Sequence, residues 1–310
     1  MVGQNCWMTK LQQNYPTDLN DIQWLKIRPY LPDKAQTGRP REHGWRMILN
    51  SIFYILQSGC AWRMLPKEMP PWKTVYHYFR LWRKDGTWER INRLLREKVR
   101  LKFGKKRQAS ASILDSQSVK TSEGGSECGF DAGKKVTGRK RHALVDTLGL
   151  VLKAVVTAGN VQDRDGAKSL LEEISAEEDV VKRLKLIWAD GGYRGELISW
   201  VEETLGWKLE IVEKPKDKNG FQVLPKRWIV ERTFAWLVRQ RRLARDYERL
   251  PDTSESFIYV AMIRLMLRRL APQRLFRHFL KVFLANLRYA WQGYLANCVS
   301  SRARKPLGFF

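Results

Sequence analysis

The sequence predicts an α/β fold, a mixed β-sheet with flanking helices, preceded by a small all-α domain like a helix-turn-helix. Apolar residues recur at helical spacing through about the first 105 residues, and from residue 108 the pattern changes to strands that later alternate with helices. The 310 residues are enough for two ordinary domains and a tail. We therefore predict a helical domain at 1–105, a sheet domain at 106–270 and a basic amphipathic tail at 271–310.

Four helices are predicted in the first domain. They cover residues 19–27, 45–57, 70–84 and 87–103, and a basic loop at residues 37–41 follows the first. The third helix has an apolar face and leaves basic and aromatic side chains off it, namely Lys73, Tyr76, His77 and Arg80. Short helices with tight turns suit a helix-turn-helix that presents this helix to a DNA groove. The alternative is a packing module whose basic residues only solvate it.

The second domain is predicted to begin with three meandering strands. They cover residues 110–119, 139–148 and 150–158, with a hairpin at Gly149 and a mobile connection from Thr121 to Gly138. A helix at 165–180, a strand at 184–189, a helix at 196–205, a strand at 207–212 and a long helix at 226–250 follow. This is the element order of a ribonuclease-H-like fold.

The net charge of +25, with a pI near 10.1, indicates a polyanionic partner. The charge is +11 over residues 1–104, +1 over 105–224 and +13 over 225–310. Two basic flanks around a near-neutral centre favour a long polyanion such as DNA or RNA, although a basic face for solubility is an alternative. We see no secretory signal and no apolar stretch that would span a membrane, so we expect a cytoplasmic protein.

Three carboxylates stand in apolar contexts. Asp115 lies within the first strand, Asp190 ends the strand LKLIWA before Gly191-Gly192, and Glu231 lies in a largely apolar stretch of the long helix. Buried carboxylates are costly unless they are paired or bind a metal, and their oxygens are ligands that Mg²⁺ or Mn²⁺ prefers. Two such ions, about 4 Å apart, catalyse in-line phosphoryl displacement. The alternative is that Asp115 caps a turn, Asp190 ends a strand and Glu231 pairs with Arg227.

Basic residues on the long helix are predicted to lie near Glu231. At about 100° per residue, Arg227 and Arg242 fall within about 40° of it and Arg239 about 80° away.

Other polar residues are given structural roles. Asp146 is expected to form a turn, Asp163 and Asp165 to cap a helix, and His142 to be structural.

Several runs resemble those of bacterial insertion-sequence DDE transposases of the family-five type, in the insertion sequence four/five superfamily. They are ILDSQSVKT, GRKRHALVDTLGL, WADGGYRG and RWIVERTFAWLVRQRRLARDYER, together with an N-terminal run from Gly38 to Ile91. The resemblance implies a ribonuclease-H-like nuclease with Asp115, Asp190 and Glu231 as metal-binding acids and Arg227 as the arginine four residues before the glutamate. Leu224 and Val238 replace a tyrosine and a lysine of the related pattern, so Arg239 or Arg242 is expected to replace the lysine. Lys120, Tyr193 and Arg194 are further expected DNA contacts.

The resemblance implies a transposase that binds terminal inverted repeats of an insertion sequence, cleaves the element ends and joins the 3′ hydroxyls to target DNA with two Mg²⁺ or Mn²⁺ ions. A homodimer is expected when two double-stranded ends are paired. One alternative is a metal-dependent DNA nuclease without strand transfer. The other is an inactive transposase-derived DNA-binding regulator, which leaves the three acids without a purpose.

Overall fold

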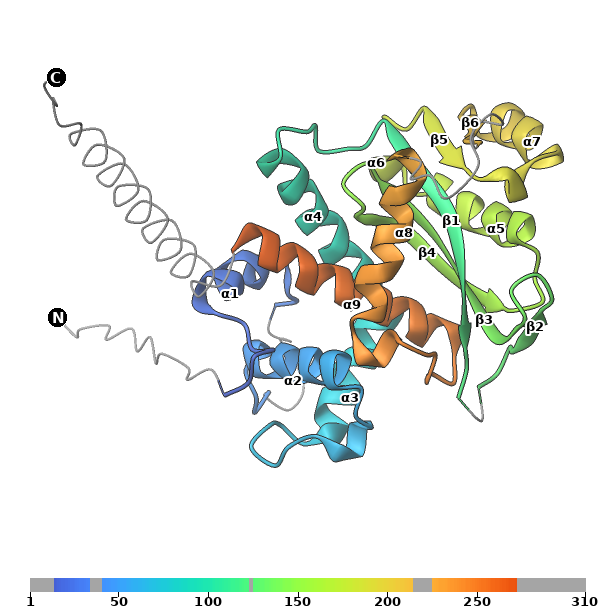
Figure 1. Ribbon diagram of the computed structural model, residues 1–310. Helices are drawn as coiled ribbons and strands as arrows, with labels where there is room; N and C mark the ends of the chain where they lie inside the picture. The colour runs from blue at the N-terminus through green and yellow to red at the C-terminus, as the bar shows by residue number, and fades with distance from the viewer. Residues whose placement is uncertain (1–13, 34–40, 123–124, 214–224, 272–310) are drawn as a thin grey trace, which may run out of the picture. The chain divides into compact units, whose positions relative to one another are not determined.

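The computed structural model describes residues 14–33, 41–122, 125–213 and 225–271, and its described residues up to 102 form helices joined by turns and loops (Figure 1). They are α1 (Asp21–Ile27), α2 (Trp45–Ser58), α3 (Trp72–Lys84) and α4 (Thr87–Lys102), with 3-10 turns at Arg28–Tyr30 and Trp62–Met64. All four predicted helices are therefore confirmed.

Local sequence explains where these helices begin and end. The Asn20 side chain accepts a hydrogen bond from the Gln23 N–H at 2.8 Å, and the Gln23 side chain accepts one from the Asn20 N–H, which makes a capping box before α1. Gly59 ends α2 in the left-handed region, with φ +73°, which glycine adopts without a Cβ penalty.

A mixed sheet follows the helices. Its strands are β1 (Ala111–Lys120), β2 (Gly129–Asp131), β3 (Val136–Asp146), β4 (Val151–Ala158), β5 (Leu186–Ala189) and β6 (Lys208–Ile211). The order is β2-β3-β1-β5-β6, with β4 also paired to β3. The pairs that involve β3 are antiparallel, whereas β1, β5 and β6 are parallel. The predicted strands are confirmed, but the connection from Thr121 to Gly138 is not only a loop, because β2 and the start of β3 lie within it.

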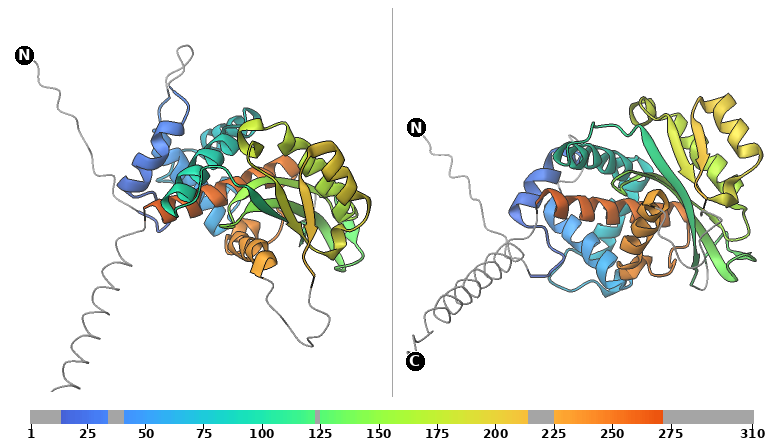
Figure 2. Two further views of the ribbon diagram at one scale, coloured as in Figure 1. Left: turned by 90° about the horizontal axis from the view of Figure 1, so that it is seen from above. Right: turned by 45° about the horizontal axis from the view of Figure 1, so that its top comes forward.

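Helices cover both faces of the sheet (Figures 1 and 2). Neighbouring residues of β1 point to opposite faces, so Ile113 joins a core with α4, α8 and α9, whereas Leu114 joins one with α5 and α7. The helices after β4 are α5 (Asp163–Ser175), α6 (Glu178–Val181), α7 (Glu196–Leu205), α8 (Pro225–Val238) and α9 (Pro251–Leu270). Asp115, two residues after Ile113, therefore lies on the face that α8 covers.

The predicted long helix at 226–250 is wrong beyond Val238, where α8 ends and a 3-10 turn at Arg241–Leu243 follows. Two buried arginines of β3 hold the next segment outside a helix. Arg139 donates to the carbonyl of Glu248 at 2.9 Å and of Arg249 at 2.8 Å, and Arg141 donates to the carbonyl of Leu243 at 2.8 Å. These carbonyls are therefore paired with the sheet instead of with a continued helix.

The helix α9 was not predicted from the sequence, yet it lies at the centre of the described structure (Figure 2). Most of its residues are buried, and it packs against α1, α2, α3, α4 and β4. Residues 1–270 form one unit, and its larger core contains residues from both sides of position 105. The division of the chain at residue 105 thus stays a proposal, and it concerns what each part does rather than two separate cores.

Some predictions fall on other parts of the chain. The tail beyond Ala271 and the basic loop at residues 37–40 lie outside the described residues. Within the described ranges, no helix has both the length and the apolar character that a membrane span requires.

Candidate active site

Asp115 and Asp190 lie on neighbouring parallel segments. Ile113 of β1 pairs with Trp188 of β5, and each acid comes two residues after its paired residue. Asp190 directly follows β5, where its carboxylate accepts a hydrogen bond from the Gly192 N–H at 2.9 Å and caps the turn Gly191–Tyr193. The structure thus places the two acids side by side in register, and Asp190 also has the strand-ending role of the alternative.

Glu231 approaches the same face from α8. Val230, Phe234 and Leu237 are buried, so α8 docks through one stripe and Glu231 lies at the stripe's edge with its side chain 43% exposed. The docking is tight at the β3–β4 hairpin, where the Thr233 hydroxyl donates to the carbonyl of Gly149 at 2.9 Å. Gly149 has φ +77°, and a Cβ there would lie 2.8 Å from the Thr233 Oγ1.

Arg227 connects the acids of β5 and α8. Its Nη2 lies 3.4 Å from Asp190 Oδ2 and 3.6 Å from Glu231 Oε1. The pairing of Arg227 with Glu231 was the alternative to a metal site, but the additional contact with Asp190 brings the two acids to one cation. Arg227 thus holds together two of the three predicted residues.

The surroundings of the third acid, Asp115, favour its protonated form. Burial, together with the charge of Asp190, raises the pKa of Asp115 to about 6, although the Ser116 N–H and the charges of Arg227 and Lys134 act to lower it. The Ser116 N–H donates to Asp115 Oδ1 at 2.7 Å. A raised carboxyl pKa means that the surroundings stabilise the ionised form too weakly, so an added cation is favoured there.

The donor chemistry fits a divalent ion, although the present arrangement is not a closed metal cage. Within the described ranges, no group of three or more His, Cys, Asp or Glu residues is arranged to hold a metal. Asp190 and Glu231 instead contact Arg227, whose charge also acts on Asp115, and the three acids supply only carboxylate oxygens, which are the ligands of Mg²⁺ and Mn²⁺. The residues that would hold such ions are therefore Asp115, Asp190 and Glu231.

The two later arginines do not share the helical face of Glu231, because α8 ends first. Arg242 is only 8% exposed, and its Nε lies 2.6 Å from Glu248 Oε1. It also donates to the carbonyl of Cys60 at 3.1 Å. The prediction that Arg242 shares the helical face of Glu231 is thus wrong, and its DNA contact stays a prediction. Arg239 is exposed beyond the end of α8, and its DNA contact stays a prediction.

The residues near the acids in sequence differ in exposure. Tyr193 is 1% exposed in this structure, and its DNA contact stays a prediction. Burial, followed by the charges of Asp115 and Asp163, raises the pKa of Tyr193. Arg194 is exposed and pairs with Glu213, and Lys120 is exposed at the end of β1, so their DNA contacts stay predictions.

The predicted DNA-facing residues of α3 are all exposed, namely Lys73, Tyr76, His77 and Arg80. The opposite stripe of α3, which contains Val75, Phe79 and Trp82, is buried. The structure thus presents these side chains to solvent together, and their contact with DNA stays a prediction.

A polar network behind Asp115 was missed by sequence reasoning. The Lys134 Nζ donates to the Ser116 carbonyl at 3.2 Å and the Ser116 Oγ at 3.1 Å, and that hydroxyl donates to Asp163 Oδ1 at 2.9 Å. Lys140 lies 3.1 Å from the same Asp163 oxygen. The basic pair Lys134-Lys135 was visible, but only the pairing of β2 with β3 returns Lys134 to β1.

The structural roles given to Asp146 and His142 are confirmed, whereas the helix-capping role given to Asp163 and Asp165 is not, since both lie inside the first turn of α5. Asp146 forms the hairpin turn by accepting hydrogen bonds from the N–H groups of Leu148 at 2.8 Å and Leu150 at 2.9 Å. His142 is fully buried, and burial lowers its pKa to about 4, so it is neutral at pH 7. Gln162, not Asp163, occupies the N-cap of α5, so the capping prediction for Asp163 is wrong.

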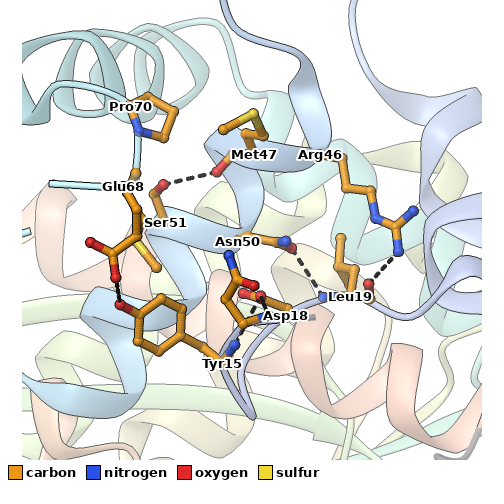
Figure 3. Close-up of a pocket in the computed structure, with 11 residues that line it drawn as sticks. Tyr15, Asp18, Leu19, Arg46, Met47, Asn50, Ser51, Glu68 and Pro70 are labelled. Carbon is orange, nitrogen blue, oxygen red and sulfur yellow. Dashed lines mark hydrogen bonds between the residues drawn. The ribbon is translucent and has the colours of Figure 1, made fainter. Parts of the chain in front are cut away.

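A small pocket lies among the helices of the first hundred residues (Figure 3). Tyr15 bonds to Glu68 across it, Asp18 accepts from the N–H groups of Asn14 and Tyr15 at 3.0 and 3.1 Å, and Asn50 accepts from the Leu19 N–H at 3.0 Å. The contacts join its lining residues to one another, and none of the three acids lines it. We therefore assign this pocket a structural role.

Comparison with known proteins identifies two matching families. Residues 106–266 match the family described as "transposase DDE domain", and residues 19–92 match "putative transposase of IS4/5 family". The first match contains Asp115, Asp190 and Glu231, and the second contains α3.

Relatives of the chain come from two bacteria. A "putative transposase for insertion sequence element IS402" of Burkholderia cepacia is 30% identical over 39% of this chain and 59% of its own length. An uncharacterized 16.2 kDa protein of insertion element IS402, from the same organism, is 30% identical over 36% of this chain and 78% of its own length. The uncharacterized protein y4sN of Sinorhizobium fredii is 25% identical over 27% of this chain and 68% of its own length. No solved structure matches the chain.

Proposed function

The chain belongs to the transposase DDE domain family, and from this premise we propose that it cleaves the ends of an insertion sequence and joins the 3′ hydroxyls to target DNA. We also propose that its mixed sheet is ribonuclease-H-like. One observation supports the site most directly. Arg227 brings Asp190 and Glu231 together on the face of the sheet where Asp115 has a raised pKa.

Asp115, Asp190 and Glu231 would hold two Mg²⁺ or Mn²⁺ ions, which supply Lewis acidity to the phosphoryl oxygen and to the attacking hydroxyl. The chain's own residues provide the positions. β1 and β5 fix the two aspartates in adjacent register, and the docking of α8 at Gly149 fixes Glu231. Both cleavage and joining are phosphoryl transfers, so the same three carboxylates serve both steps.

We propose that the exposed residues of α3 recognise the terminal inverted repeats. Lys73 and Arg80 would contact phosphates or base edges, with Tyr76 and His77 between them. Since an element has two ends, two copies of the chain would act together when the ends are paired. These roles would explain why the helical portion is as basic as it is.

An assay with purified protein and duplex DNA that carries both element ends tests the function. We expect Mg²⁺-dependent cleavage followed by joining. Asp190→Asn should lower both steps by about a thousandfold or more while DNA binding persists, because one ligand charge is lost. Asp179→Asn is the matched control, since Asp179 is an exposed acid that pairs with Arg93 away from the site.

Three other outcomes of this assay would each contradict a different part of the proposed function. Absence of cleavage in any divalent metal would contradict both enzyme functions and favour the DNA-binding regulator. Cleavage without joining would favour a nuclease. Full activity of Asp190→Asn would remove the proposed site while leaving the family intact.

A further inference from the structure

Two arginines and a tryptophan form a cluster where α8 meets the end of α9. The guanidinium carbon of Arg232 lies 4.8 Å from the centre of the Trp236 ring, and that of Arg269 lies 4.6 Å from the same centre. Arg232 and Trp236 are one turn apart on α8, whereas Arg269 belongs to the last turn of α9. The aromatic ring thus gathers two like charges that would otherwise repel each other.

Neither guanidinium has a carboxylate partner among the described residues. Each donates only to the carbonyl of Leu148, at 3.4 Å from Arg232 and 3.5 Å from Arg269, which is longer than the usual N–H···O distance of about 2.9 Å. The Nε of Arg232 is buried and has no hydrogen-bond partner within the described ranges. Burial, and then the charge of Arg232, lowers the pKa of Arg269. The cluster therefore has unused donors and uncompensated positive charge.

Asp146 is the acid whose charge acts on Arg269 by raising its pKa, but this carboxylate is already paired with other groups. Asp146 is fully buried, its Oδ2 lies 2.6 Å from Arg100 Nη1, and its other oxygen accepts the two N–H groups of the hairpin turn. A further cation lies beside Arg269, because the Nζ of Lys102 donates to the carbonyl of Leu270 at 3.3 Å. An anion from outside the chain is what the cluster lacks.

The position of the cluster on α8 indicates which anion this is. Arg232 lies about 100° and Trp236 about 140° around the helix from Glu231, so acids and cluster occupy opposite edges of the solvent-facing side of α8. The two edges are about one helix diameter, roughly 10 Å, apart. A DNA strand rises about 3.4 Å per nucleotide, so a strand that crosses α8 presents another phosphate about three nucleotides from the acids.

We infer that Arg232 and Arg269 bind a backbone phosphate of the DNA strand whose neighbouring phosphate reacts at Asp115, Asp190 and Glu231. The inference rests on the proposed function. Guanidiniums match phosphate oxygens with paired donors, and stacking on Trp236 holds them in place before DNA arrives. The contact reads no base, so it positions the strand rather than selecting its sequence.

The salt dependence of binding to a duplex of about 30 base pairs tests the inference. The slope of log K against log salt is negative, and each lost phosphate contact reduces its magnitude by about 0.9. We expect the double variant Arg232→Gln/Arg269→Gln, which loses this one phosphate contact, to reduce the magnitude of the slope by about 0.9, and each single variant by about half of that change. Arg90→Gln should keep the wild-type slope, because Arg90 is an exposed arginine in a groove lined by Glu89, Glu177 and Glu178.

Four further results separate the causes. If the double variant loses its far-UV circular dichroism, the single variants and the charge-retaining Arg232→Lys and Arg269→Lys variants carry the test. A wild-type slope in folded Arg→Gln variants would overturn the inference while leaving the transposase proposal intact. Inorganic phosphate that binds the wild type as tightly as DNA does, with no change in the DNA slope of the variants, would assign the cluster to free anions and also overturn it. A wild-type protein that binds no duplex would refute the proposed function itself.

Discussion

Arg227 is the residue on which the proposed site depends for its shape. It contacts Asp190 at 3.4 Å and Glu231 at 3.6 Å. Both carboxylates are partly exposed, but screening by water alone would not overcome the repulsion between their like charges. The arginine acts as a positioning residue, whose charge lets two acids approach before any metal arrives. Because β1 and β5 pair in register, the contact of Asp190 and Glu231 with Arg227 lies next to Asp115.

Arg227→Gln should therefore slow single-turnover cleavage by about tenfold to a hundredfold, because the two carboxylates would separate. Arg227→Lys should recover part of the loss, since an ammonium reaches one carboxylate but not two. The rate at saturating and at limiting Mg²⁺ measures the effect, with Lys226→Gln as the control because Lys226 pairs with Glu210 instead. An Arg227→Gln enzyme with the wild-type rate at every Mg²⁺ concentration would show that the acids need no such cation.

Glu255 provides a pH-dependent contribution to stability at a distance from the acids. Burial raises its pKa from 4.5 to about 7, with smaller increases from Glu173 and Asp252 and decreases from the Val156 N–H and Lys153. A folded-state pKa above the unfolded value means that the fold favours the protonated carboxyl, so stability is lost as pH rises from about 4.5 through about 7.

Glu255→Gln should then stabilise the protein at pH 8 by up to about 3 kcal/mol and have little effect at pH 4.5. The amide oxygen can still accept the hydrogen bond that Val156 N–H donates at 2.8 Å. Urea denaturation at the two pH values measures this difference. Equal effects of the substitution at both values would mean that Glu255 has an ordinary pKa.

At the scale of elements, the contact between α8 and the β3–β4 hairpin positions Glu231. Gly149→Ala would combine two penalties, the positive φ of +77° and a Cβ 2.8 Å from Thr233 Oγ1. We expect a loss of about 2–4 kcal/mol in the free energy of unfolding, together with weaker cleavage. Gly86→Ala is the matched control, because its φ is +70° but no atom lies within 4 Å of the added Cβ.

The control should lose only about 1–2 kcal/mol and retain cleavage. Chemical denaturation and the single-turnover rate distinguish the two variants. If Gly149→Ala and Gly86→Ala behaved alike, the close approach of α8 to the hairpin would not matter for either stability or activity.

Most elements could be predicted because their patterns are local. α2 and α3 each have an apolar face, β4 is a short apolar run that is buried on both faces of the sheet, and their predicted bounds agree closely with the structure. The end of α8 could not be predicted, since it depends on Arg139 and Arg141, which lie about a hundred residues earlier in the chain. The α9 helix was missed because it is buried on nearly all sides and so lacks an amphipathic period.

The candidate acids could be selected from sequence because each stands beside an apolar run, and the Arg227–Glu231 pair because of its four-residue spacing. The contact between Arg227 and Asp190 is not visible in the sequence, since it joins two elements across a segment outside the described residues. The burial of Tyr193 and Arg242 was not predicted, for a common reason. Burial in a tertiary core, at 1% and 8% exposure, decided their roles and left no local signal.

For the whole molecule, the charge excess is less available to DNA than the sequence suggested. Several basic residues of the two flanks are buried in the described structure and bond to carbonyls or acids, including Arg96, Arg100, Arg242 and Arg264. Arg139 and Arg141 in the middle segment are also buried. Only part of the basic charge is therefore available to DNA. The exposed side chains of α3 and the cluster around Trp236 are two parts of the basic surface that the structure describes.

The shared core predicts cooperative unfolding of the described residues. Phe257 of α9 is fully buried and stacks on Phe79 of α3 at 4.7 Å between ring centres, while the neighbouring Tyr259 hydroxyl accepts a hydrogen bond from the Ala154 N–H of β4 at 3.2 Å. Phe257→Ala should lower the free energy of unfolding by about 3–5 kcal/mol.

Hydrogen exchange resolved by element measures the cooperativity. Protection in α3 and in β4 should fall together in Phe257→Ala, because the same core stabilises both. Leu81→Ala is the control, since Leu81 lies on α3 but is 43% exposed. Loss of protection in α3 alone would indicate a helical domain that folds independently of the sheet.

The order of the elements along the chain also matters for how copies of the gene lose activity. The three proposed ligands all precede residue 232, whereas the helix that completes their supporting core spans Pro251–Leu270. A ribosome that terminates between these points releases a polypeptide with every catalytic motif and no completed interior. Such truncated copies would be inert despite an intact set of acids, so reading a copy as active requires the codons of α9 as well as those of the acids.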